Sequence, residues 1–348
     1  MGLTEMSSGM KFLVASACLI VILAGLKLAA VIVTPLLLAV FIATLVAAPV
    51  GWLVTKRVPA PLAISLTLIV LILLVITLGA IVVESAQQLY AKQPEYVAKL
   101  NSMLESWEPT LIQLGLPTAI KLEEILNAAT IWSLASQTLT GVGNLISNSF
   151  LILLVFVLIL IESSALTKKM RNLLSATESD RTWLDAFATN IHHYIVIKTI
   201  HSLGTGLLIA LGTWLLGVDF PILWGLLAFI LNYIPNIGSI IAALPAVLVA
   251  VVQLGMGTAL GVIVLFVGIN VLIGSFIEPR FMGERLGLST LVVFLSLVFW
   301  GYMFGTVGML LSVPITMTIK IAAEANPSTR WLSDLLGNTV TDDEIEPE

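Results

Sequence analysis

The chain has 348 residues, of which 58% are hydrophobic and only 11% are Asp, Glu, Lys or Arg, against about 25% charged residues in ordinary soluble domains. This composition excludes a soluble enzyme, and a net charge of −5 offers no basic patch to a nucleic acid. The single cysteine, Cys18, excludes a disulfide within one chain and a metal site built on cysteines.

The apolar residues fall in long runs, which predict an all-α polytopic membrane protein embedded in a lipid bilayer. We expect about seven to eight transmembrane helices, including broken or re-entrant half-helices. We divide the chain into five regions: 1–83 as an N-terminal three-helix membrane region, 84–143 as extracytoplasmic amphipathic helices, 144–190 as a fourth helix and cytoplasmic linker, 191–321 as a transport core with broken helices, and 322–348 as an acidic cytoplasmic tail.

The N-terminal region contains apolar runs at residues 12–26, 28–54 and 61–83. We interpret the first two as helices joined by a tight hairpin, not as a cleaved signal, because no hydrophilic domain follows the first run. Lys56 and Arg57 follow the second helix, and four basic residues follow the fourth, within 168–181. Lys and Arg mark cytoplasmic loops, so the N-terminus is predicted to be cytoplasmic.

The segment 84–143 then lies outside, and its six acidic residues against three lysines do not oppose this. Apolar residues recur at helical spacing between Pro94 and Pro109, and again over 122–129. We expect short amphipathic helices that lie against the membrane surface or a neighbouring subunit. A substrate-capturing cap is the alternative.

A polar stripe marks the fifth helix, at about residues 191–217. Its members share one helix face and are Tyr194, Lys198, His201 and Thr205. A charge near the bilayer centre costs about 3 kcal/mol, so Lys198 either faces a polar cavity or extends to the cytoplasmic surface. His192 and His193 point to different faces, so no metal site with His201 is expected.

Residues 220–254 are too long for one comfortable span, since a single helix of that length measures about 52 Å and the hydrocarbon core only about 30 Å. The middle of this stretch contains Pro235 and Gly238, which interrupt helices, and Asn236 and Ser239, which can cap one. The pattern favours two half-helices that meet near mid-membrane, with a single kinked helix as the alternative.

A second interruption follows at residues 278–287, where Glu278 is expected to pair with Arg280 or Arg285; an ordinary loop is the alternative. The last apolar run, 290–321, contains Gly301 and Gly305 at the G-x-x-x-G spacing of close helix packing, and its length also permits a hairpin. Residues 190–254 and 257–320 match in length, but their break points do not superpose, so an inverted repeat stays open.

Enzymatic signatures are absent from the sequence: it has no phosphate-binding G-x-x-x-x-G-K-[ST] loop, no H-E-x-x-H and no G-x-S-x-G. We therefore predict a transporter that uses no cofactor and no metal, in which a polar region of broken helices lies within an apolar bundle.

Several motifs carry a family resemblance, and they lie at 224–229, 231–239, Glu278-Pro279-Arg280 with Met282-Gly283, 286–297 and 308–314. In these segments the chain resembles the autoinducer-2 exporter (AI-2E) family of bacterial inner-membrane transporters, in particular its quorum-sensing exporter branch. The resemblance implies a homo-oligomer, with a pentamer as the expected form. It also implies export of autoinducer-2 by an elevator-like shift of the broken-helix region. Other relatives have been linked to sodium/proton antiport.

The chemistry of the polar residues agrees with that expectation. A small polyhydroxylated molecule is bound by neutral amides and hydroxyls with few charges. The predicted site consists of Tyr194, Lys198, His201, Asn232, Pro235, Asn236, Gly238, Ser239, Asn270, Glu278 and Arg280, with Ser275 as a further hydroxyl. We expect Lys198 and Glu278 to meet across the polar core, and Glu278 to carry a coupling H⁺ or Na⁺.

Two other functions stay open. A sodium (lithium)/proton antiporter would need Glu278 or Asp219 in the ion path. A scaffold that does not transport would recruit partners through the external segment and the acidic tail.

Overall fold

The protein is described here by a computed structural model that covers residues 7–113, 152, 154–159, 178–235, 237–282, 287–324 and 328–337. No strand occurs in these residues. The helices in chain order are α1 (Ser8–Leu28), α2 (Ala30–Thr55), α3 (Ala60–Gln113), α7 (Glu178–Leu215), α8 (Pro221–Leu231), α9 (Ile237–Leu254), α10 (Met256–Asn270), the π-helix Val271–Ile277, α11 (Glu278–Met282), α12 (Thr290–Glu324) and α13 (Arg330–Leu336).

Among the described residues, six helical segments are long and apolar enough to cross a membrane: Ala30–Thr55, Ala60–Lys92, Thr189–Leu215, Ile237–Leu254, Met256–Ile277 and Thr290–Glu324. Two shorter apolar helices, Leu13–Leu28 and Pro221–Leu231, accompany them. The predicted all-α membrane class is confirmed.

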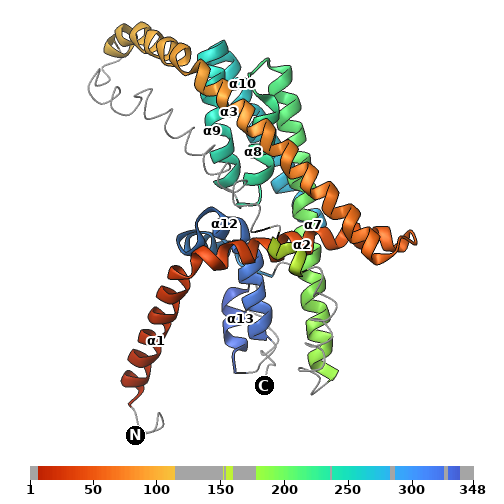
Figure 1. The fold of residues 1–348 in the computed structure, drawn as a ribbon. Helices are drawn as coiled ribbons and strands as arrows, with labels where there is room; N and C mark the ends of the chain where they lie inside the picture. Colours follow the sequence, from red (N-terminus) through yellow and green to blue (C-terminus); the bar gives the residue numbers. More distant parts are fainter. Residues whose placement is uncertain are drawn as a thin grey trace, which may run out of the picture.

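The connection between α1 and α2 is a bend, so the predicted tight hairpin is wrong. One residue, Ala29, separates the two helices, and its backbone is close to helical (φ −77, ψ −1). Its N–H still donates to the Gly25 carbonyl at 2.9 Å. An antiparallel reversal needs a loop of about two to five residues, and in Figure 1 the two helices instead diverge at a wide angle.

Helix α3 is continuous over 54 residues, or about 81 Å. The predicted helix between Pro94 and Pro109 is confirmed as helical, but the predicted end near residue 83 and the separation of the two helices are wrong, because both belong to α3. A proline removes one backbone donor and kinks a helix, but here Lys92 and Tyr96, on either side of Pro94, both bind Asp219. The helix is thus held by the same partner before and after the proline. The predicted helix at 122–129 lies outside the described residues.

Helices α8 and α9 form a hairpin, which confirms the predicted break and contradicts the kinked single helix. A Cβ built on Gly238 would lie 1.8 Å from the carbonyl oxygen of Leu231. In a continuous helix these two residues would be about 10 Å apart along the axis. The chain therefore folds back on itself here, and the absence of a side chain at Gly238 lets the backbones touch.

Helix α12 is a second hairpin. Gly305 has φ 64 and ψ −146, a conformation that only glycine adopts readily. Trp300 Nε1 donates to Thr316 Oγ1 at 3.0 Å. The two residues are 16 positions apart in the sequence, and in a straight helix they would be separated by about 24 Å. Gly301 lies against Met309 across the turn. One glycine of the G-x-x-x-G pair thus provides the predicted close packing, whereas the other makes the turn.

Helix α7 extends through most of the height of the molecule in Figure 1. In its upper part it runs past α8, α9, α10 and α3, and in its lower part it continues beside α12. Helices α7 and α8 approach closely at Gly206 and Gly225, where a Cβ built on either residue would lie within 2.7 Å of the other's carbonyl oxygen. Trp224 is fully buried in the core that α7 and α8 share with α9 and α10. The hairpin α8–α9 is therefore packed tightly on α7.

Candidate functional site

The polar stripe on α7 is buried along its whole length. The exposed fractions of its members are 7% for Tyr194, 5% for Lys198, 8% for His201 and 6% for Thr205. A lysine that extends to the membrane surface would be solvated at its tip, so that interpretation of Lys198 is wrong. The stripe faces protein, and its polar atoms must find partners there.

The partner of Lys198 is Glu278, as predicted. Nζ of Lys198 lies 2.7 Å from Oε1 of Glu278, and the two side chains are 7% and 17% exposed. Burial of two charged groups costs desolvation energy, and the attraction between them offsets part of that cost. Loss of either partner therefore leaves the other charge buried and uncompensated. The predicted pairing of Glu278 with Arg280 is wrong, because Arg280 is exposed and the carboxylate turns towards α7 instead. Arg285 lies outside the described residues.

A π-helix positions Glu278, and no pattern in the sequence predicts it. Val271–Ile277 forms this wider helix directly after α10, and Glu278 is the next residue. Its extra residue per turn rotates everything that follows relative to α10, which is one reason why π-helices occur frequently at functional sites. Asn270 precedes the π-helix and is partly buried, whereas Ser275 within it is exposed.

The broken hairpin is bonded to α7 beside the ion pair. Asn232 Nδ2 donates to Ser202 Oγ at 3.0 Å, and the hydroxyl of Tyr233 donates to Thr199 Oγ1 at 2.7 Å. Ser202 lies one helical turn after Lys198, so its spacing could have placed it on the stripe. Among the remaining predicted residues, Pro235 and Ser239 are partly buried and Gly238 is buried, while Asn236 lies outside the described residues.

His201 completes this cluster. Its ring contacts Phe281 of α11 in an edge-to-face arrangement, with 5.6 Å between centroids. Its Nδ1 has no hydrogen-bond partner, which sets it apart from the other buried side-chain nitrogen and oxygen atoms of the described residues. The same residues contain no group of three or more His, Cys, Asp and Glu side chains that could hold a metal.

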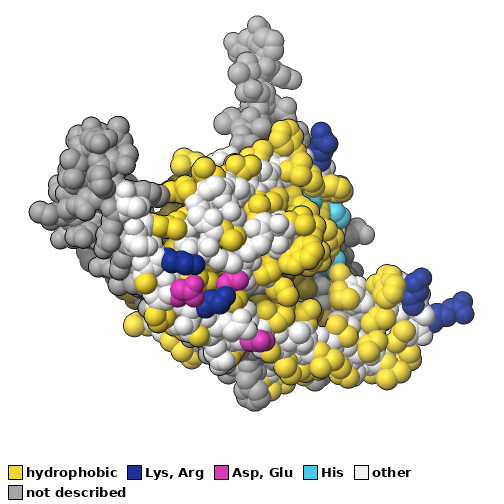
Figure 2. Space-filling view, turned by 90° about the horizontal axis from the view of Figure 1, so that it is seen from above, with side chains coloured by type: hydrophobic (Ala, Val, Ile, Leu, Met, Phe, Trp, Pro, Cys, Tyr) yellow, Lys and Arg dark blue, Asp and Glu magenta, His cyan; other side chains and the backbone are white. Residues whose placement is uncertain are grey.

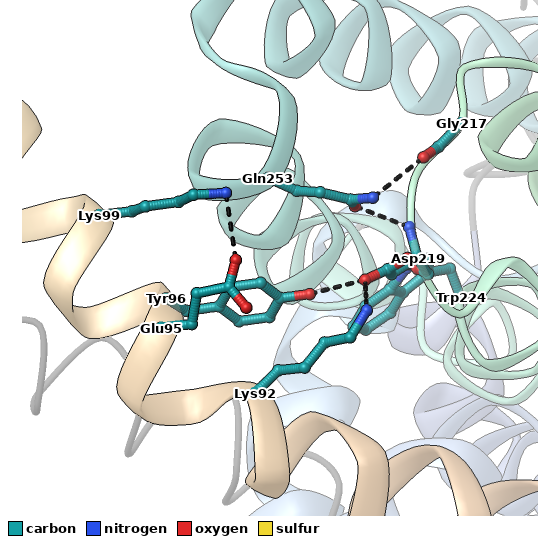
Figure 3. A network of polar contacts seen from close by, with 8 residues as sticks. All are labelled: Lys92, Glu95, Tyr96, Lys99, Gly217, Asp219, Trp224 and Gln253. Atoms are coloured by element: carbon teal, nitrogen blue, oxygen red, sulfur yellow. Dashed lines mark hydrogen bonds and ion pairs between the residues drawn. The ribbon is translucent and has the colours of Figure 1, made fainter.

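A second polar network joins α3 to the loop between α7 and α8 (Figure 3). The carboxylate of Asp219 accepts hydrogen bonds from Lys92 and from the Tyr96 hydroxyl, the latter at 2.8 Å. The backbone N–H of Asp219 donates to Oε1 of Gln253 at 2.8 Å, and Trp224 Nε1 donates to the backbone carbonyl of Asp219 at 2.6 Å. Seen from above, charged side chains gather in one small area of a largely apolar face (Figure 2).

These contacts set the ionisation of Asp219 and Tyr96. Burial raises the pKa of Asp219, but the hydrogen bonds from Lys92 and Tyr96 outweigh it and hold the pKa below its usual value. Burial and the adjacent carboxylate raise the pKa of Tyr96. Asp219 is therefore charged at neutral pH and bonded to α3. Such a residue keeps its negative charge and is not a site that exchanges protons.

The sequence that forms these apolar helices, the two broken hairpins and the buried ion pair matches a known family. The model of the AI-2E family transporter matches residues 17–328. The chain belongs to the AI-2E transporter family. It is therefore a multi-pass membrane protein in a family of transport proteins.

AI-2E relatives cover nearly the whole chain. One is AI-2 transport protein TqsA of Escherichia coli, which is 36% identical over 95% of this chain and 96% of its own length. A Haemophilus influenzae protein is 39% identical over 92% of this chain and 94% of its own. YhhT of Escherichia coli is 34% identical over 95% of both chains. The last two are named for transport without a stated solute.

Proposed function

We propose that this AI-2E transporter is a secondary transporter that exports a small polar signalling molecule similar to autoinducer-2 across the bacterial inner membrane. In this proposal its N-terminus is cytoplasmic, it acts as a homo-oligomer, and the core 191–321 makes an elevator-type movement. The observation that carries the proposal is the buried Lys198–Glu278 pair, which lies where the broken hairpin meets α7 within an apolar bundle. The name of the relative TqsA supports the choice of solute.

The chemistry of the cluster suits a neutral hydroxylated solute. The charges of Lys198 and Glu278 cancel within the pair, so an uncharged ligand adds no uncompensated charge. Amides and hydroxyls beside the pair, at Asn232 and Ser202, can exchange their mutual hydrogen bond for bonds to a ligand. Apolar walls with a few convergent polar groups are the usual composition of a small-molecule site.

The packing supports α7, α8 and α9 as one moving body. The glycine contact between α7 and α8 leaves no room for sliding, and the break is bonded to α7 by two side-chain hydrogen bonds. In contrast, α3 meets this body partly through polar contacts at Asp219, which can break and reform. A coupling H⁺ or Na⁺ would drive export.

A sodium (lithium)/proton antiporter is the second candidate. The buried carboxylate of Glu278 favours it, because acidic residues inside membranes often mark ion pathways. The Asp219 alternative is weaker, since its carboxylate is already bonded to Lys92 and Tyr96. A scaffold without transport has no need of a buried ion pair, and the acidic tail that it would use lies outside the described residues.

Transport in proteoliposomes tests the proposal. The purified chain should carry labelled autoinducer-2 across vesicle membranes, in uptake and in efflux, and should not exchange sodium for protons in its absence. Gly238→Ala would place a Cβ against Leu231, and Pro235→Ala would let the helix continue, so both should abolish transport. Gly268→Ala is the matched control, because nothing lies within 4 Å of its added Cβ. Sodium/proton exchange without solute transport would favour the antiporter instead.

A further inference from the structure

His201 has a buried nitrogen that the fold does not use. The side chain is on α7, one turn after Lys198, and only 8% of the residue is exposed. Its Nδ1 lacks a hydrogen-bond partner. An unsatisfied buried polar atom is destabilising, and each such atom in a native protein requires an explanation, of which a catalytic role or a bound ion is one.

The charged groups that act on His201 are those of the ion pair. Burial disfavours a positive charge on the imidazole, Glu278 on α11 favours one, and Lys198 on its own helix opposes one. Tyr194, one turn before Lys198, also lies within the field of the Glu278 carboxylate. The ring of Phe281 covers one edge of the imidazole. A proton on His201 would therefore compete with Lys198 for a single carboxylate.

We propose that His201, in place of the Glu278 expected from the sequence, is the residue that binds the coupling proton, with Nδ1 as the accepting atom. This inference rests on the proposed function and names its coupling ion. Neutral His201 carries its proton on Nε2 and offers the Nδ1 lone pair. A proton from the water on one side forms the Nδ1–H bond, the imidazolium draws Glu278 away from Lys198, and the same proton leaves to the other side after the core has moved.

The chemistry of the atom favours a proton over sodium. Histidine is the side chain whose unperturbed pKa lies in the physiological range, while hard cations such as Na⁺ prefer several oxygen ligands. The open position at His201 is a single nitrogen. Weakening of the Lys198–Glu278 contact would also loosen α11 from α7, which gives the proton a direct effect on the site.

The test compares His201→Asn with His193→Asn in proteoliposomes. Asparagine can hydrogen-bond from the position of Nδ1 but does not titrate. His193 is on the same helix and is exposed, so it is the matched control. Two modes are measured with labelled autoinducer-2: counterflow at equal pH, and accumulation driven by a gradient of one pH unit. For one proton per solute, accumulation should approach about tenfold per pH unit.

We expect both modes in the unchanged chain and in His193→Asn. His201→Asn should lose pH-driven accumulation even when its counterflow at equal pH is measurable, and that counterflow is expected to be slower because His201 belongs to the polar cluster. Tenfold accumulation by His201→Asn, or counterflow without pH-driven accumulation in the unchanged chain, would overturn the inference and leave the proposed function intact. Absence of counterflow in the unchanged chain would overturn both. As a second measurement, the unchanged chain in weakly buffered detergent should change its proton binding by about one per bound solute, and no change would refute the assignment.

Discussion

The buried ion pair can be tested by a double-mutant cycle with Lys198→Met and Glu278→Gln. Each single variant leaves one charge without its partner in a site where the two side chains are 7% and 17% exposed. At an effective dielectric constant of about 20, Coulomb's law gives roughly 6 kcal/mol of gross attraction for the 2.7 Å contact. Desolvation offsets much of this. Removal of one partner from a buried pair typically costs about 3–5 kcal/mol.

The double variant leaves neither charge unpaired. Its free energy of unfolding should therefore exceed the additive expectation by about 0.5–3 kcal/mol. Transport should not recover with stability, because the carboxylate belongs to the proposed site. The free energies can be measured by titration of detergent micelles with sodium dodecyl sulfate, with tryptophan fluorescence as the signal.

The pair Lys99–Glu95 provides a control with the same types of side chain. It lies on α3 at a separation of 3.3 Å, with the two side chains 46% and 62% exposed. Exposed helical pairs of this spacing contribute only about 0.3–0.5 kcal/mol. Additive losses at Lys198 and Glu278, or a coupling no larger than that of the control pair, would refute the claim that these two charges stabilise each other.

Three further predictions concern the turn, the α3 contact and the orientation. Gly305→Ala should destabilise the chain by about 1–3 kcal/mol because of its positive φ, whereas Gly257→Ala, within α10, should not; equal thermal shifts would contradict this. Asp219→Asn should lower the unfolding temperature at pH 7. The difference in unfolding temperature between this variant and the unchanged chain should shrink below about pH 4, where the depressed pKa of Asp219 is approached. A difference that does not depend on pH would argue against the ion pair. In a Cys18→Ala background, Glu105→Cys should react with an impermeant maleimide from outside, and reaction from the cytoplasmic side alone would invert the topology.

Much of the site could be predicted from sequence because a charged side chain within an apolar run has few possible environments in a membrane. A lysine and a glutamate that are both placed among membrane helices have few ways to avoid isolation, so the contact between Lys198 and Glu278 followed from their chemistry. The break at Pro235 and Gly238 was equally accessible, since the stretch around it fits neither one span nor two.

The features that sequence reasoning missed depend on tertiary contacts. Nothing in Val271–Ile277 distinguishes a π-helix from an α-helix, because the two differ only in whether each backbone hydrogen bond spans five residues or four. The continuation of α3 through Pro94 depends on Asp219, which is far away in sequence. The orphaned Nδ1 of His201 is likewise visible only when every neighbour is in place.

The repeated order of helix and hairpin was only partly accessible. Both α7 and α10 are followed by a hairpin, α8–α9 in the first case and α12 in the second. The first turn is made by a five-residue break, the second by Gly305 within an apparently continuous run. Break points of such different chemistry do not align in sequence, which explains why the two stretches match in length but not in motif.

The central claim is that the solute binds where the broken hairpin meets α7, and protection of a single cysteine tests it most directly. Ser239, just after the break, is partly buried, and Ser239→Cys in a Cys18→Ala background is a small change. Provided that this variant still transports, autoinducer-2 should slow its reaction with a small thiol reagent. Thr55→Cys, at the end of α2, is exposed and should react at one rate with or without solute. Equal rates at position 239 in the presence and absence of solute would contradict the placement of the binding site.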